Sequence, residues 1–398
     1  MYKNLFADDK IDFGVLKQRA SSMRWGALPE DVIPLTSADP DFMPAQEIRE
    51  AMVEYIQGGY FPYAPFTGIP GLRETLAQGQ LIRNGVHVNP GFVVPVDSAA
   101  AALHAVATSI LAPGDEAIIF DPVDLLFGIS VRYAGAKEVC YPSVYENGRW
   151  KLDDLEDYIT PKTKMICLCN PHNPLGYLYQ EEELRIIAET ARKHNLWIMN
   201  DEVWSDIVYS EHKFTSICTL GQELNQRTIT CYGFSKGFAL PGLRAGYIYT
   251  MSQEAYDKVT RVANGHTHGV DVVTQTAMKA AYEKAFPWVD AFRAHLQQIR
   301  DVVYDRFTAM PLIEPTKQQA TFVTFPSIAK TGMTSEEFSN FCMDECRVAI
   351  VPGTAEWFGP RGSGHVRFCY STSHAVINEA LDRVEQGLIR LADKKNLG

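Results

Sequence analysis

Short apolar runs and amphipathic stretches alternate along residues 92–249, and this alternation constrains the fold more than any other feature of the sequence. Such a βαβ rhythm is typical of a mostly parallel sheet that is covered by helices. The expected strands are Phe92–Val96, Glu116–Phe120, Glu138–Tyr141, Met165–Cys169, Trp197–Asn200, Thr228–Tyr232 and Ala245–Tyr249. Apolar residues at helical spacing predict helices at Ala99–Leu111 and Glu181–Asn195. We therefore expect an α/β fold with a three-layer large domain.

The pattern changes after Pro287, where helices and short strands suit a smaller α+β domain. The expected elements there are a long helix at Val289–Met310, a strand at Thr321–Phe325, a helix from Ser335, strands at Val348–Ile350 and Val366–Cys369, and a final helix. The chain has 398 residues, more than the ~100–200 of a typical domain. We expect an N-terminal segment at 1–45 that packs with the small domain, a large domain at 46–286 and a small domain at 287–398.

The charge balance argues against nucleic acid and anionic membranes as partners. There are 37 Lys and Arg against 48 Asp and Glu, a formal net charge of −11, and such a surface repels phosphate backbones. No stretch reaches the ~18 apolar residues of a membrane span, and the N-terminus has no apolar signal region. The cysteines form no zinc-like pairs, and His266 and His268 have no third ligand nearby, so we expect no metal site. These features predict a cytoplasmic protein.

Polar side chains follow three of the expected strands at the point where each strand ends. These strand ends are the loop Asn170-Pro-His-Asn173-Pro, the pair Asp201-Glu202 and the run Gly233-Phe-Ser235-Lys236. In a parallel sheet a ligand lies beyond the carboxyl ends of the strands, so we expect Asn173, Asp201 and Lys236 to meet. Each feature alone fits a turn, a helix cap or a solvated lysine. Their occurrence together points to a ligand site.

A further strand end offers a site for an anion. Strand Phe92–Val96 is followed by Asp97-Ser98-Ala99, a helix start whose small side chains let a phosphate approach free backbone N–H groups. Arg244 would add a guanidinium to the same phosphate. A lysine, a carboxylate, an amide and a phosphate cup together meet the needs of pyridoxal phosphate. The lysine supplies a Schiff base, the carboxylate keeps the pyridine nitrogen protonated, and the amide orients the ring hydroxyl.

With these residues in place, the sequence resembles the fold-type-I pyridoxal-phosphate enzymes of the class I/II aminotransferase superfamily. The resemblance covers nearly the whole chain, from Ile33–Phe42 to Val366–Phe368. Its motifs are Tyr63-x4-Gly68-x3-Leu72-Arg73, Pro113-Gly-Asp-Glu116, Asn170-Pro-x-Asn-Pro-x-Gly176, Asp201-Glu-Val203 and Ser235-Lys236-x7-Arg244-x-Gly246-Tyr247. The resemblance implies an aspartate-aminotransferase-like fold and a homodimer with shared active sites.

The resemblance also implies a role for individual residues. Lys236 would form the internal aldimine with the cofactor, Asp201 would face the pyridine nitrogen, and Asn173 would bind the ring hydroxyl. The phosphate would be held by Ser98, Ala99, Ser235 and Arg244, and Tyr63 would reach the phosphate of the neighbouring subunit. On the substrate side the candidates are Ala38, Asp124 and Arg367, of which Arg367 would bind the substrate carboxylate. The implied reaction is transamination between an α-amino acid and a 2-oxo acid.

Ser98, Gly233, Trp204 and Asp124 depart from the family pattern, and the last two bear on the cofactor ring. Trp204 stands where the family usually has Tyr, so a hydroxyl donor is missing and the indole is expected to pack in the core. Asp124 replaces the aromatic residue that normally stacks on the cofactor ring. Phe127 is the candidate to replace that aromatic residue, and Asp124 is the alternative, as a contact of the substrate.

Two branches of the superfamily stay open at this point. Ser22-Met-Arg-Trp25, Ala38-Asp39 and Ser205-Asp-Ile-Val-Tyr209 are similar to cystathionine β-lyase-like C–S lyases, which release pyruvate and ammonia. The segment from Lys236 to Tyr247 is more similar to the aminotransferases and is the longer match, so transamination is favoured. The run Gly233-Phe-Ser235-Lys-Gly237 also fits the nucleophile elbow of α/β-hydrolases. Pro241-Gly242 follows too soon for the helix that this elbow needs.

Overall fold

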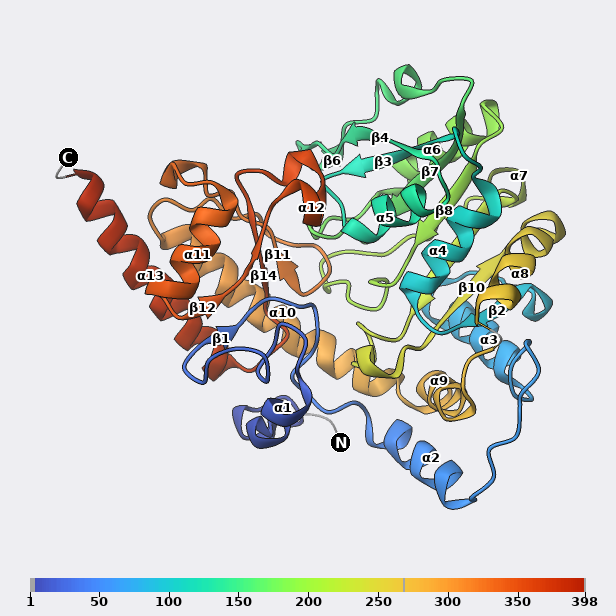
Figure 1. Ribbon diagram of the computed structural model, residues 1–398, viewed down its shortest axis with the longest axis horizontal. Helices are drawn as coiled ribbons and strands as arrows, with labels where there is room; N and C mark the ends of the chain where they lie inside the picture. Colours follow the sequence, from blue (N-terminus) through green and yellow to red (C-terminus); the bar gives the residue numbers. More distant parts are fainter. Residues whose placement is uncertain (1–3, 268, 397–398) are drawn as a thin grey trace.

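The computed structural model describes residues 4–267 and 269–396. Its largest feature is a seven-stranded sheet with the strand order β2-β10-β9-β8-β7-β3-β4 (Figure 1). Strand β10 runs antiparallel to both of its neighbours, and the other pairs are parallel. The bounds are β2 Val93–Val96, β3 Glu116–Asp121, β4 Lys137–Pro142, β7 Thr163–Cys169, β8 Trp197–Asp201, β9 Thr228–Gly233 and β10 Gly246–Thr250.

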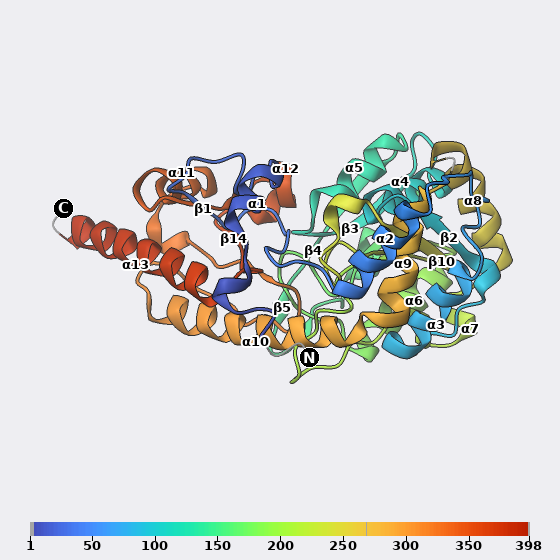
Figure 2. The ribbon, with the colours of Figure 1, turned by 90° about the horizontal axis from the view of Figure 1, so that it is seen from below.

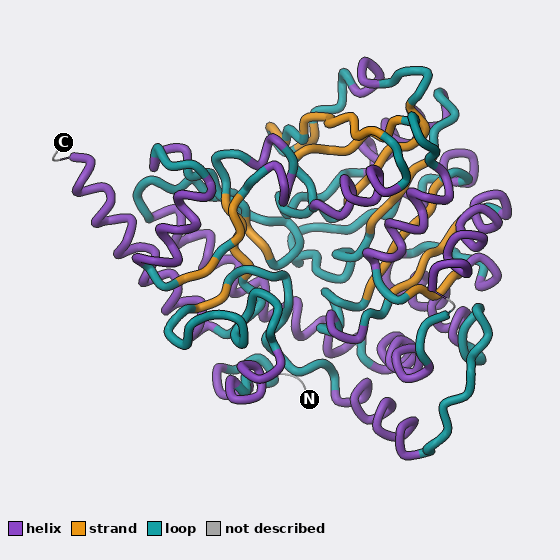
Figure 3. The backbone as a smooth tube through the Cα atoms, viewed as in Figure 1, coloured by secondary structure: helices purple, strands orange, loops and turns teal. Residues whose placement is uncertain are grey.

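Helices cover both faces of this sheet because its strands carry apolar side chains on both sides. In β3, Ile118 and Phe120 belong to one buried cluster, whereas Ala117 and Ile119 belong to a second. Helices α3, α6 and α9 contribute to the first cluster and α4, α5 and α8 to the second, which makes three layers (Figures 1 and 3). Their bounds are α3 Leu72–Asn84, α4 Ala99–Ile110, α5 Leu125–Tyr133, α6 Glu181–Lys193, α8 Gln253–Thr267 and α9 Val272–Lys284.

A second, three-stranded sheet has the antiparallel order β11-β14-β13. Beside it, the short N-terminal strand β1 pairs in parallel with β12, so segments from the two ends of the sequence lie together. The long helix α10 extends along one side of the molecule from the large sheet toward the small one (Figure 2). The bounds are β1 Ile33–Pro34, β11 Val323–Thr324, β12 Val348–Ala349, β13 Val351–Pro352, β14 Val366–Cys369, α10 Phe286–Ala309, α11 Ser335–Glu345 and α13 His374–Asn396. The remaining elements are α1 Phe13–Arg19, α2 Gln46–Gln57, β5 Tyr145–Glu146, β6 Arg149–Trp150, α7 Gln222–Asn225 and α12 Ala355–Phe358.

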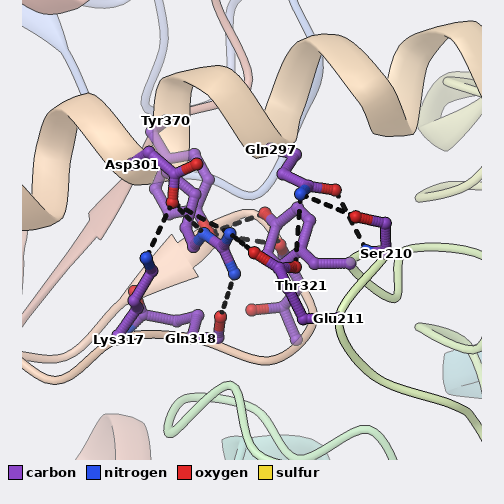
Figure 4. Close-up of polar contacts among 10 residues, drawn as sticks. Ser210, Glu211, Gln297, Asp301, Lys317, Gln318, Thr321 and Tyr370 are labelled. Atoms are coloured by element: carbon purple, nitrogen blue, oxygen red, sulfur yellow. Dashed lines mark hydrogen bonds and ion pairs between the residues drawn. The ribbon is translucent and has the colours of Figure 1, made fainter.

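A buried arginine of α10 contacts the segment that follows β8 and the segment that precedes β11. Figure 4 shows the polar contacts in this region, with Glu211, Gln318 and Tyr370 labelled. Arg300 is 1% exposed, and its Nη1 donates to the Gln318 carbonyl at 2.9 Å while its Nη2 donates to Glu211 Oε1 at 2.8 Å. Its Cζ lies 4.4 Å from the centre of the Tyr209 ring. The Tyr209 hydroxyl lies 2.8 Å from the hydroxyl of Tyr370, which directly follows β14. These contacts hold α10 against the segment that follows β8 and against the segment that precedes β11.

The predicted α/β fold is confirmed, and each of the seven strands predicted for the large sheet lies within two residues of an observed strand. The strand predicted at Thr321–Phe325 is shorter, because Thr321 has a φ of 71°, in the left-handed region that a strand excludes. The strand predicted at Val348–Ile350 is shorter too, because Ile350 separates β12 from β13, which belong to different sheets. Within the described part of the chain, no helix is both long and apolar enough to cross a membrane.

Candidate active site

A cavity of about 250 Å³ lies at the carboxyl ends of the parallel strands. Its lining includes residues at or just beyond the ends of β2, β7, β8 and β9 and a residue of β14, so both sheets contribute to it. All of the predicted site residues except Phe127 and Tyr63 line this cavity. They are Ala38, Ser98, Ala99, Asp124, Asn173, Asp201, Ser235, Lys236, Arg244 and Arg367.

Lys236 lies just beyond β9 and projects into the cavity without a carboxylate partner in hydrogen-bond range among the described residues. Its Nζ donates to the Ala38 carbonyl at 2.7 Å and lies 5.3 Å from the centre of the Trp204 ring. Burial lowers the pKa of Lys236, and the nearby Arg367 guanidinium lowers it further. Both effects favour the neutral amine, which is the nucleophilic and basic form.

Asp201 is the last residue of β8 and is buried. Its Oδ1 accepts a hydrogen bond from the Val203 N–H at 2.9 Å, and its Oδ2 has no hydrogen-bond partner among the residues that the structure describes. Burial raises the pKa of Asp201 to about 7, with the carboxylates of Asp124 and Glu202 acting in the same direction. A cationic nitrogen that enters the cavity would therefore find a carboxyl oxygen ready to pair with it.

The start of helix α4 forms a cup for an anion. Ser98 is the N-cap residue, and its Oγ accepts the Ala101 N–H at 3.0 Å, while the preceding backbone N–H groups stay available for a ligand. Gly246 keeps this cup compact, because a Cβ there would lie 2.9 Å from the Ala99 nitrogen. Arg244 lines the same cavity with a φ of 54°. The cup fits a phosphate group.

Asn173 links Asp124 to Arg367 across the cavity. Its Nδ2 donates to Asp124 Oδ2 at 2.9 Å, and its Oδ1 accepts from Arg367 Nη1 at 3.4 Å. Arg367 Nη2 also donates to the Thr36 carbonyl at 3.4 Å, while its buried Nε has no partner within the described residues. The guanidinium thus keeps hydrogen-bonding capacity, which fits a ligand carboxylate.

Phe127 does not reach the cavity, so the expected stacking on a cofactor ring has no support from this arrangement. Asp124 caps helix α5 by accepting the Leu126 N–H at 3.1 Å, and this helix start directs Phe127 into the apolar core, where it is 1% exposed. Leu126 lines the cavity instead. Trp204, which we expected only in the core, is buried and also lines the cavity beside Lys236. Leu126 is the second residue of α5, and the N-cap at Asp124 was the signal for it, because an N-cap fixes the helical phase.

Tyr63 is fully exposed and lies outside the cavity of its own chain. His268 lies outside the described residues. Among the residues that are described, no group of three or more His, Cys, Asp or Glu side chains could hold a metal ion.

Known proteins are similar to this chain in both sequence and fold. The family model for Aminotransferase class I and II matches residues 30–384. An aspartate aminotransferase of Pyrococcus abyssi is 35% identical over 364 residues, which are 90% of this chain and 92% of the relative. The solved structure of an aromatic aminotransferase from Pyrococcus horikoshii is 31% identical with a TM-score of 0.85, and the match covers 91% of this chain and 97% of that one.

The fold extends to a more distant protein. Cystalysin from Treponema denticola, which contains a pyridoxal 5′-phosphate cofactor, has a TM-score of 0.88 at 20% identity, and the match covers 94% of this chain and 97% of that one. The cup, the buried amine and the strand-end carboxyl fit the same cofactor in this chain. The chain therefore belongs to the class I and II aminotransferases and is an enzyme that uses pyridoxal phosphate.

Proposed function

We propose that the enzyme transfers the amino group of an α-amino acid to a 2-oxo acid, with its chemistry centred on Lys236. The observation that carries this proposal is the convergence of Lys236, Asp201 and Asn173 with the anion cup at the start of α4. Pyridoxal phosphate supplies an aldehyde that amines attack and a protonated ring that withdraws electrons from the substrate Cα. The residues of the cavity bind the cofactor and substrate and move the proton.

The cofactor would be held at two ends. The Ser98 hydroxyl, the Ala99 N–H, the Ser235 hydroxyl and the Arg244 guanidinium would bind its phosphate, and all four residues line the cavity. Asp201 would pair with its ring nitrogen, and that positive charge would offset the desolvation which raises the carboxyl pKa. The Asn173 amide would donate to its ring hydroxyl, and the Asp124 carboxylate holds this amide in one orientation.

Lys236 moves the proton that the reaction requires. Its Nζ takes the proton from the substrate Cα, and burial, which lowers the pKa of the amine, favours the neutral form that this step needs. Arg367 binds the substrate carboxylate and thereby fixes the orientation of the Cα–H bond. Ala38 accepts a hydrogen bond from Lys236 Nζ through its carbonyl, and it keeps the amine on the substrate side of the cavity.

We also propose a homodimer with shared active sites. The segment between α2 and α3 exposes large aromatic side chains, with Tyr60 85%, Phe61 58%, Tyr63 105% and Phe66 47% exposed. This loop extends around the edge of the molecule in Figure 1. A contiguous exposed apolar patch favours a protein partner, and a second copy would cover it while bringing Tyr63 to the phosphate of the neighbouring site.

The remaining parts of the proposal concern organisation and location. We propose that residues 46–286 form the cofactor-binding domain and 287–398 the small domain, with 1–45 packed against the latter. The pairing of β1 with β12 supports this division. The net charge of −11 and the free cysteines among the described residues fit a cytoplasmic enzyme without nucleic-acid or membrane partners.

A donor panel tests the reaction. The holoenzyme is mixed with L-aspartate, L-glutamate, L-tyrosine, L-alanine or L-cystathionine, because relatives act on aspartate and on aromatic amino acids according to their names. Transamination gives one equivalent of 2-oxo acid per site until an acceptor 2-oxo acid is added, and then turns over. Continuous release of pyruvate and ammonia from cystathionine without an acceptor would establish the C–S lyase instead.

A further inference from the structure

The carboxyl end of β3 is hydrogen-bonded to a turn between β13 and β14 of the small sheet. Asp121, the last residue of β3, accepts the Arg361 N–H with both carboxylate oxygens, at 3.2 and 3.3 Å. Two residues further on, the Val123 N–H donates to the Phe358 carbonyl at 2.9 Å. The turn formed by residues 358–361 is therefore held at both of its ends, by hydrogen bonds to Asp121 of β3 and to Val123 just beyond it.

The close approach of this turn to Asp121 demands a particular backbone. Gly359 has a φ of 87°, and a Cβ at that position would lie 2.3 Å from Asp121 Oδ1. Only a glycine allows both the conformation and the contact. The turn is thus shaped around the Asp121 carboxyl group.

A buried aspartate at this position would destabilise the fold if the position served packing alone. It is 3% exposed, and burial raises its pKa to about 6. The charged groups that face it are Arg361, which opposes this rise, and Glu138, which adds to it. Burial of an ionisable carboxyl opposes folding unless its contacts offset the desolvation, so the hydrogen bonds to the turn are the evident gain.

The turn carries an aromatic ring that lies against the proposed carboxylate anchor. The Phe358 ring is buried, and its centre lies 5.1 Å from the Arg367 guanidinium carbon. The ring also packs against Phe325, with ring centres 5.1 Å apart. Within the described residues the hydrogen bonds of Arg367 are long, at 3.4 Å, so the Phe358 ring is a principal support of its orientation.

We propose that Asp121 is a positioning residue for substrate binding, which holds the 358–361 turn on β3 and thereby keeps Phe358 against Arg367. The inference rests on the proposed role of Arg367 as the anchor of the substrate carboxylate. Asp121 itself does not line the cavity. Its effect on the substrate is therefore indirect, and the turn is the route that this proposal assigns to it.

Single-turnover kinetics of the holoenzyme test this, with the donor that the wild type converts fastest in the panel above. The apparent dissociation constant and the limiting rate of the first half-reaction are measured separately. Asp121→Ala should raise the dissociation constant about tenfold, as expected for loss of a hydrogen bond to a charged group, and leave the limiting rate within about twofold. Asp121→Asn, which keeps an acceptor for the Arg361 N–H, should restore most of the affinity.

Asp115→Ala is the matched control, because Asp115 also accepts a backbone N–H, that of Ala112 at 2.8 Å, but just before the opposite end of β3. It should leave substrate affinity unchanged. Phe358→Leu should raise the same dissociation constant, and combining it with Asp121→Ala should add little, because both act through the same support. If Asp121→Ala does not fold, Phe358→Leu alone still tests the proposal.

Arg367→Gln separates the inference from the proposed function. If Arg367→Gln leaves the affinity unchanged, the anchor is wrong and the role of Asp121 falls with it. If Arg367→Gln weakens binding while Asp121→Ala or Phe358→Leu does not, the anchor stands and the inference is overturned. Equal impairment by Asp121→Ala and Asp121→Asn, or a fall in the limiting rate alone, would also overturn it.

Discussion

Replacing Asp201 by Asn should stabilise the cofactor-free enzyme while weakening its hold on the cofactor. The pKa of Asp201 is raised from 3.8 to about 7 by burial, so the folded chain binds this proton more tightly than the unfolded chain does. Ionisation of Asp201 therefore opposes folding increasingly between pH 4 and pH 7, and the penalty is fully present above that range. The pKa difference corresponds to a penalty on the order of 4 kcal/mol.

Asparagine removes this penalty and keeps an oxygen for the Val203 N–H, which Asp201 binds at 2.9 Å. The cofactor-free Asp201→Asn protein should therefore melt several degrees above cofactor-free wild type at pH 8, and the difference should shrink toward pH 4–5. With saturating pyridoxal phosphate the order should reverse, because only the aspartate pairs with a protonated ring nitrogen. Melting curves at a series of pH values, with and without the cofactor, measure both effects.

Glu202→Gln is the matched control for this experiment. Glu202 is the next residue and is also buried, but its carboxylate accepts hydrogen bonds from Ser216 Oγ at 2.5 Å, Asn200 Nδ2 at 2.8 Å and Tyr249 Oη at 3.0 Å. An amide nitrogen would face at least one of these donors, so Glu202→Gln should melt lower than wild type at pH 8. An Asp201→Asn protein that melts at or below wild type at pH 8, or a difference that does not vary with pH, would refute the reasoning.

Three further predictions concern the cofactor and the dimer. Lys236→Ala should abolish covalent attachment of the cofactor to the chain after borohydride treatment, read by mass spectrometry; attachment that persists would place the reactive amine elsewhere. Gly246→Ala should weaken cofactor binding about tenfold or more in a fluorescence titration, because the added Cβ would lie 2.9 Å from the Ala99 nitrogen. Gly242→Ala is the control and should bind the cofactor normally, because its Cβ would have no atom within 4 Å. Equal affinities of the two variants would exclude the start of α4 as the phosphate site. Tyr63→Ala and Lys236→Ala subunits, each impaired alone, should recover activity when refolded together into heterodimers, and no recovery would exclude a shared site.

The large sheet could be predicted because its strands are short apolar runs with buried side chains on both faces. Residues that follow such strands must meet at one edge of a parallel sheet, so Asn173, Asp201 and Lys236 were found from their positions alone. The strand at Val323–Thr324 was less predictable, because the left-handed conformation of Thr321 depends on contacts with the Ile207 carbonyl, far away in the sequence.

The rest of the site depends on helix phase and on contacts between distant segments. Phe127 was the candidate for the ring because it is the next aromatic residue after Asp124 in the sequence. In the structure, the N-cap at Asp124 determines which side chain of α5 faces the cavity. Leu126 could have been found by giving weight to that cap. The contact of Asp121 with Arg361 joins residues 240 positions apart, and no local pattern marks such a pair.

The contacts of Arg300 connect the chain segments that carry Asp201 and Arg367. Tyr209, against which its guanidinium lies, follows Asp201 by eight residues, and Tyr370, which contacts Tyr209, follows Arg367 by three. Asp201 and Arg367, which are proposed to bind opposite ends of the reacting molecule, are thus both connected to Arg300, which lies outside the cavity. Misplacement of reacting groups by about 1 Å can slow catalysis about 100-fold. Arg300, through Tyr209 and Tyr370, therefore connects the chain segments that carry Asp201 and Arg367, and a change at Arg300 is expected to alter the distance between these two residues.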